Sequence, residues 1–181
     1  MNRVGQAIRY AIGLAVLSSI CGAATAQTLT MAVGAAPISV DPHYSVLTPN
    51  VSLASHVYDA LINRDATSKP VPGLALSWRL VDDTTWEFKL RPGVKFHNGD
   101  AFTADDVAHT IARVPKVVNS PGGFAIYTRT FTDVIVVDPL TVRLKTAAIY
   151  PLAPVDLREV KIIPRATGWL VTSTGGQSAP R

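Results

Sequence analysis

The 181-residue chain carries 17 Lys and Arg residues against 13 Asp and Glu residues, for a formal net charge of +4. The basic residues are scattered and are not interleaved with aromatic residues, so nothing indicates a nucleic-acid partner. Its one cysteine, Cys21, lies near the amino terminus, so an apolar core rather than a disulfide framework must stabilise the remainder.

Residues 1–26 have the features of a secretory signal peptide. A positively charged start precedes an apolar run from Ala11 to Ile20, and Ala24-Thr25-Ala26 supplies small residues at a cleavage site. A membrane anchor is the alternative, but the run is shorter than the roughly 20 apolar residues of a span. Lipid attachment at Cys21 is a further alternative, although Ile20 replaces the small residue usual there. We expect a soluble product that begins near Gln27, with no direct membrane insertion after cleavage.

A strand and a helix are predicted next. Residues 28–34 alternate in the manner of a strand, which ends before the prolines that follow. Thr48 is placed to cap a helix and Pro49 fits its first position. One face of this helix is predicted to face the core on the spacing of Leu53, Val57 and Leu61.

Two hairpins are predicted further along the chain. The first joins strands that contain Trp78 and Trp86, and we assign both rings to the core face of a sheet rather than to a cofactor platform. The second joins residues 134–137 to 141–144 through Asp138-Pro139. Short antiparallel strands with helices between them indicate an α+β region.

The stretch "RPGVKFHNGDAFTADDVAHT", residues 91–110, contains residue types found in metal sites. Gly93 and Asn98-Gly99 indicate turns, which leaves His97 as the last residue of a strand. Zinc and iron sites need three or four ligands, and no second histidine stands at a suitable spacing. We therefore expect no metal site.

The two adjacent acids of this stretch are interpreted as scaffold. Thr103 and Asp106 have the spacing of a capping box, with Asp in place of Glu, and Asp105 adds charge to the first helical turn. The helix is predicted from Ala104 to about residue 114, with Val107 and Ile111 on its inner face. No nucleophile elbow, Walker loop, dinucleotide fingerprint or zinc-protease motif occurs, so we expect no enzyme.

Three segments carry a family resemblance: "SVDPHYS", "VYDALINRD" and "PVPGLALSWRLVDDTTWEFKLRPGVKFHNGDAFTADDVAHTI". They resemble the amino-terminal part of the family 5 extracellular solute-binding proteins, the peptide and nickel receptors of ABC importers. The resemblance spans roughly Thr28 to Arg165 and is most specific from Trp78 to Val107. It implies an α/β, periplasmic-binding-protein type II-like fold, of which this chain holds the amino-terminal part of lobe one with its β-rich, α+β subdomain.

The resemblance also implies a domain organisation. Residues 1–26 are expected to be the signal peptide, 27–165 a partial solute-binding domain, and 166–181 a disordered tail unlike the family. Because such receptors are several times longer, we expect a truncated or frame-shifted reading, with a natural flexible tail as the alternative.

The function implied is that of a periplasmic substrate-binding component of an ABC importer for oligopeptides or dipeptides, with nickel, haem and opine-like compounds as alternative ligands. It would act as a monomer that docks on the membrane permease, without a cofactor. A secreted structural or interaction module is the alternative. Ligands of open α/β sheets bind at the carboxyl ends of strands, so Tyr44 and Thr48, in the loop after the first strand, are the candidate lining residues. A surface ring and a helix cap are the alternative roles of these two residues.

Overall fold

The computed structural model describes residues 34–166. The predicted signal peptide, the first strand apart from Gly34, and the predicted tail apart from Ala166 lie outside the described residues. No helix of the described part is long and apolar enough to cross a membrane.

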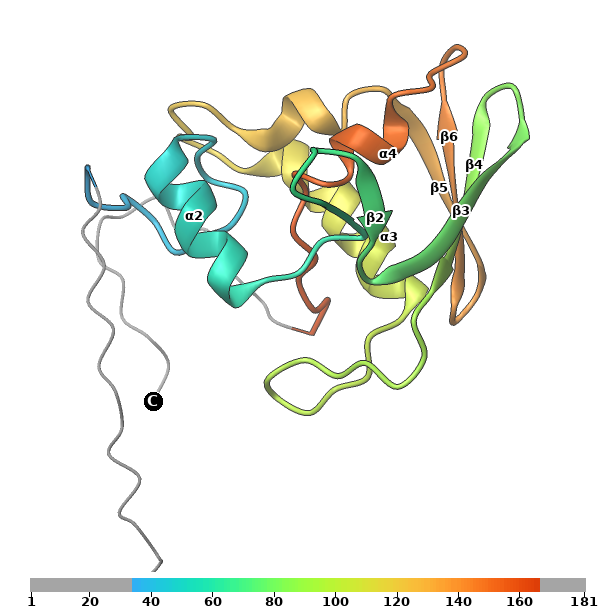
Figure 1. The fold of residues 1–181 in the computed structure, drawn as a ribbon, viewed down its shortest axis with the longest axis horizontal. Coiled ribbons are helices and arrows are strands. Elements are labelled where there is room, and N and C mark those ends of the chain that lie inside the picture. Colours follow the sequence, from blue (N-terminus) through green and yellow to red (C-terminus); the bar gives the residue numbers. More distant parts are fainter. Residues whose placement is uncertain (1–33, 167–181) are drawn as a thin grey trace, which may run out of the picture. The chain divides into compact units, whose positions relative to one another are not determined.

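A four-stranded antiparallel sheet forms the larger layer of the described part (Figure 1). Its strands are β3 (Ala75–Asp82), β4 (Thr85–Leu90), β5 (Phe131–Asp138) and β6 (Thr141–Thr146), in the order β3-β4-β6-β5. Both predicted hairpins are confirmed, and the strands of the second are longer than predicted.

One face of the sheet is apolar because side chains alternate along each strand. Phe88 of β4 pairs with Trp78 on one side and with Val142 on the other, and Trp86 pairs with Leu144. Both tryptophans are half-buried against the core, as predicted. Leu80, by contrast, stays 45% exposed, because β3 is the edge strand and its pairing with β4 is irregular at this end.

The opposite face of the sheet carries a charged row at its centre. Glu87 of β4 lies between Arg79 of β3 and Arg143 of β6 in the strand register. Its two carboxylate oxygens bind the arginines at 2.8 and 2.7 Å. Hydrogen bonds from Arg79 and then from Arg143 hold the pKa of Glu87 below its usual value, so the carboxylate stays charged under its two partners.

Helix α3 (Ala104–Arg113) packs against β5 and β6. Its predicted cap is confirmed: the backbone N–H and the hydroxyl of Thr103 both donate to one oxygen of Asp106, at 2.9 and 3.2 Å. The other oxygen of Asp106 accepts the backbone N–H of Arg165 at 2.9 Å. Val107 and Ile111 are buried as predicted. Asp106 is therefore scaffold.

Helix α2 (Thr48–Val57) differs from its prediction. Leu47 occupies the N-cap position, no side chain caps the helix, and Thr48 is already helical. The predicted apolar stripe is wrong, since Val57 is 46% exposed and the buried residues are Asn50 and Ala54. Asn50 faces inward because its amide donates to the carbonyl of Ser39 at 2.9 Å, which gives this backbone carbonyl of the preceding loop a hydrogen-bond partner.

Several short elements were not predicted. They are the strands β1 (Ile62–Arg64) and β2 (Pro70–Pro72), the 3-10 turns η1 (Val114–Lys116) and η2 (Phe124–Tyr127), and α4 (Ala153–Asp156). An isolated bridge between Ala60 and Lys161 joins the start of the β1 hairpin to the carboxyl-terminal segment. Side chains from these elements complete the core, whose largest fully buried members include Phe88, Phe124, Leu61, Ile62, Leu144 and Leu157.

Gly73 fills a position where the chain passes very close to another segment. A Cβ atom there would lie 2.6 Å from the carbonyl oxygen of Ala60 and 3.0 Å from that of Leu61. We expect Gly73→Ala to lower the free energy of unfolding by about 1–3 kcal/mol, because backbone rather than a side chain must move. Gly122→Ala is the matched control, since its Cβ would make an ordinary 3.5 Å contact with Val46. Equal denaturation midpoints for the two variants would contradict this account.

Candidate functional site

The loop predicted to contact ligand is tied to residues 117–123. The backbone N–H of Val46 donates to the carbonyl of Gly122 at 2.9 Å. The Tyr44 hydroxyl donates to the carbonyl of Asn119 at 2.9 Å, and the Ser120 hydroxyl donates back to the carbonyl of Tyr44. Tyr44 is therefore half-buried and acts as a clamp between two loops.

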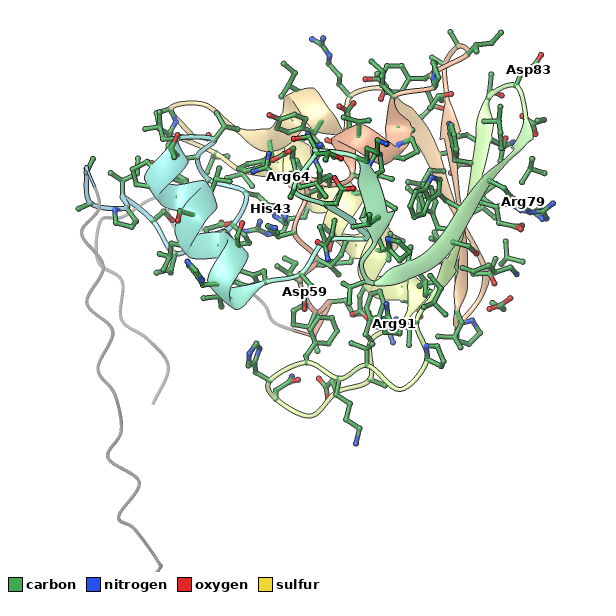
Figure 2. The ribbon with its side chains drawn as sticks, in the orientation of Figure 1. His43, Asp59, Arg64, Arg79, Asp83 and Arg91 are labelled. Atoms are coloured by element: carbon green, nitrogen blue, oxygen red, sulfur yellow. The ribbon has the colours of Figure 1, made fainter. Side chains whose placement is uncertain are left out.

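A cluster of Arg113, Asp41 and His43 links the same loop to the end of α3. The guanidinium of Arg113 binds both carboxylate oxygens of Asp41, at 3.2 and 2.6 Å, and donates to Nδ1 of His43 at 2.8 Å. Nε2 of His43 lies 2.7 Å from the carbonyl of Lys161. Because a guanidinium only donates, Nδ1 accepts and Nε2 carries the proton. His43 lies between α2 and the rest of the described fold (Figure 2).

His43 is a structural residue rather than a proton carrier. Its side chain is fully buried, and both ring nitrogens have partners. Burial, reinforced by the charge of Arg113, lowers the pKa of His43 to about 4. The ring is therefore neutral at pH 7, and no lone pair is left to accept a proton from a substrate.

A hollow of about 460 Å³ opens beside the exposed side of α2. Thr48 lines it, together with residues that the chain supplies from three other places: Arg64 at the end of β1, Phe124 and Tyr127 of η2, and Glu159 after α4. Tyr44 is not among the lining residues. The structure thus places one of the two candidate residues in the hollow and the other in the loop clamp.

The hollow combines opposite charges with hydroxyl groups. Arg64 is exposed, whereas Glu159 is partly buried and its Oε1 accepts a hydrogen bond from Nε of Arg158 at 3.0 Å. Burial and then the charge of Glu159 raise the pKa of Tyr127, so its hydroxyl stays protonated. This set can hold a small ligand that has both a cationic and an anionic group.

Arg64 and Glu159 were missed by the sequence analysis. They stand far apart in the chain and belong to no local motif, because the β1 hairpin and the segment after α4 bring them to one hollow. The "INRD" context of Arg64 indicates no strand, and its position in the lining of the hollow follows only from the fold.

The structure corrects the assignment of His97. This residue lies in an exposed turn and does not end a strand, since only an isolated bridge joins Lys95 to Ala101. The turn is closed by hydrogen bonds from the N–H of Phe96 to Asp100 and from that of Gly99 to Phe96, both 2.9 Å. Gly99 has the positive φ of 91° that the turn requires. Within residues 34–166, no group of three or more His, Cys, Asp or Glu residues is placed to hold a metal ion.

The pKa of His43 generates a pH prediction. In the unfolded chain the imidazole titrates near 6.5, so between pH 6.5 and 4 the unfolded state binds the proton first. We expect the free energy of unfolding to fall as the pH drops through this window, by at most about 3 kcal/mol. His43→Gln should flatten the dependence, and His97→Gln, in the exposed turn, should retain it. Parallel curves for the two variants in urea titrations would refute the assignment.

Comparisons with known proteins identify the family. The model of the bacterial extracellular solute-binding proteins, family 5 (middle region), matches residues 69–176. The chain is 31% identical over 91 residues to the periplasmic murein peptide-binding protein MppA of Escherichia coli K12, covering 49% of this chain and 17% of that protein. It is 39% identical over 104 residues to the nickel-binding periplasmic protein of the same organism, covering 56% and 19%.

A solved structure of the Haemophilus influenzae oligopeptide-binding protein OppA, in complex with RPPGFSPFR, superposes with a TM-score of 0.62. It is 26% identical, and the match covers 72% of this chain and 29% of that one. The predicted type II-like fold class is confirmed by such neighbours. The chain spans less than a fifth of each of the two curated relatives. Since the family model matches more than half of its residues, the chain belongs to family 5 of the bacterial extracellular solute-binding proteins.

Proposed function

We propose that this chain forms part of a periplasmic substrate-binding component of an ABC importer, and that its ligand is a short peptide. The observation that carries the ligand class is the presence of both Arg64 and Glu159 among the residues that line the hollow beside Thr48. A peptide presents an anionic carboxylate, a cationic ammonium and several amide groups, and the hollow offers a partner for each. Relatives named for murein peptides, oligopeptides and nickel make a solute-binding role the starting point.

Each lining group has a defined part in this proposal. The Arg64 guanidinium presents a planar pair of donors that matches a peptide carboxylate. Glu159 receives the ammonium on the side that its bond to Arg158 leaves open, and that bond holds the carboxylate in place. The Thr48 hydroxyl takes part in no helix cap and is exposed, so it can pair with a peptide amide. Tyr44 does not contact the ligand in this proposal. Its hydroxyl, bonded to the carbonyl of Asn119, holds the loop that precedes Thr48 in place.

Peptide suits the hollow better than nickel does. Its lining residues supply one carboxylate, one imidazole, one guanidinium and several hydroxyls. Nickel is held by several imidazole, thiolate or carboxylate ligands around one point, whereas this set favours hydrogen bonding and charge pairing. The proposal includes a monomer that delivers its ligand to the membrane permease of the importer.

Binding by the purified chain tests the ligand class. We expect trialanine with free ends to bind more tightly than trialanine acetylated and amidated at its ends, in calorimetric or NMR titrations. Arg64→Gln should weaken binding of the free-carboxylate peptide about two- to fivefold, the scale of an exposed charge pair. Glu159→Gln should weaken the binding of peptides that have a free amine. Lys116→Gln, an exposed residue that does not line the hollow, is the control and should change nothing.

Two results would overturn the peptide assignment. The first is equal affinity for the free and the doubly capped peptide, which would show that neither charge is recognised. The second is binding of Ni²⁺ that Arg64→Gln and Glu159→Gln leave unchanged.

Export is a separate prediction of the same proposal. We expect the chain produced in a Gram-negative host to reach the periplasm and to begin near Gln27. Amino-terminal sequencing of the periplasmic fraction checks both points. A product that retains Met1 and stays in the cytosol would rule out a periplasmic receptor.

A further inference from the structure

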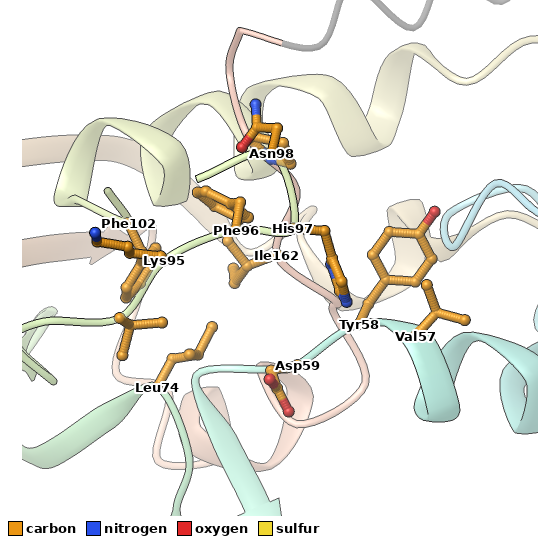
Figure 3. Close-up of a pocket in the computed structure, with 12 residues that line it drawn as sticks. Val57, Tyr58, Asp59, Leu74, Lys95, Phe96, His97, Asn98, Phe102 and Ile162 are labelled. Atoms are coloured by element: carbon orange, nitrogen blue, oxygen red, sulfur yellow. The ribbon is translucent and has the colours of Figure 1, made fainter. Parts of the chain in front are cut away.

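A second pocket, of about 260 Å³, lies under the loop between β4 and α3 (Figure 3). It shares no lining residue with the hollow beside α2. Its walls come from residues 57–59 at and just after the end of α2, from Leu74 just before β3, and from the "VKFHN" part of the 91–103 loop, and Ile162 closes the inner side. The most specific sequence motif of the chain therefore forms one wall of a cavity.

Hydrogen bonds hold both walls of this pocket in place. On one side, the loop is closed by the bond from the N–H of Phe102 to Val94, at 3.0 Å, and by an edge-to-face contact between the rings of Phe96 and Phe102, 6.0 Å apart. On the other side, the carbonyl of Asp59 accepts the N–H of Ile162 at 2.8 Å. A pocket whose walls are braced in this way is largely formed before any ligand arrives.

The interior of the pocket is apolar, and its lining includes one carboxylate, Asp59, and one ammonium, Lys95. Leu74, Phe102 and Ile162 are almost fully buried and supply the floor. Figure 3 shows the rings of His97 and Tyr58 side by side at one end, and the carboxylate of Asp59 lower in the view and apart from both rings. The ammonium of Lys95 lies toward the opposite end of the view.

We infer that this pocket binds a small apolar amine, with its hydrocarbon part on the floor and its ammonium at Asp59. A carboxylate on the rim of the pocket is complementary to an ammonium group. The apolar floor favours a hydrocarbon body. At roughly 30 Å³ for each non-hydrogen atom, the cavity takes a molecule of about nine such atoms. The site does not depend on the peptide proposal, because the two sets of lining residues are separate.

Three probes of nearly equal size but different charge test the inference. They are 2-phenylethylamine, 2-phenylethanol and phenylacetate, each titrated into the full chain and followed by NMR. We expect saturable shifts at Leu74, Phe102 and Ile162, with affinity in the order amine, alcohol, carboxylate. Asp59→Asn should weaken the amine about two- to fivefold and leave the alcohol unchanged. Asp83→Asn, an exposed acid at the β3–β4 turn, is the charge control.

A blocking variant separates occupancy of the pocket from general surface binding. Val57 lines the rim and is exposed, so Val57→Trp fills the mouth without replacing a core side chain. It should abolish the shifts from amine and alcohol alike while circular dichroism stays unchanged. Equal affinity for amine and carboxylate, shifts outside the pocket, or no saturation at millimolar concentration would each overturn the inference. Loss of peptide binding at the hollow would not affect it.

Discussion

The buried contact of Arg113 with Asp41 and His43 is the interaction on which the rest of the described fold depends. It connects the loop before α2 to the end of α3, and through His43 to the carbonyl of Lys161. Buried charges are tolerated only when they are paired and hydrogen-bonded, and here both carboxylate oxygens of Asp41 and both ring nitrogens of His43 have partners. This polar cluster therefore ties the loop before α2 both to the end of α3 and to the segment at Lys161.

Local patterns in the sequence predicted the local structure well. The two hairpins and the cap of α3 follow from alternation, turn residues and the Thr103–Asp106 spacing, all of which act within a few residues. Helix α2 was predicted, but with the wrong buried face, because Asn50 faces inward to bind a loop that no helical periodicity describes. The β1 hairpin was missed because Pro70 and Pro72 count against a strand, although both fit at an edge.

The residues that line the hollow could be predicted from the sequence only in part. Thr48 was predicted as a lining residue from its position after the first strand. Arg64 and Glu159 are far apart in the sequence, and only the tertiary fold brings them to the same hollow. The family resemblance is most specific from Trp78 to Val107, a stretch that forms turns, a helix cap and a sheet face in this chain. The residues that we propose to contact the ligand, Thr48, Arg64 and Glu159, lie outside that motif, so the motif indicates the family and not the ligand.

The row of Arg79, Glu87 and Arg143 has a consequence for how the sheet assembles. Side chains along a strand alternate between faces, so sliding β4 by one residue against its neighbours would turn Glu87 toward the core and Phe88 toward water. The slipped sheet would bury a carboxylate without its arginines and expose a large aromatic ring at the same time. The ion pairs of Glu87 on one face therefore raise the free energy of a sheet whose register has slipped on the other face. Wrongly paired strands are thus destabilised and dissociate before they pair again.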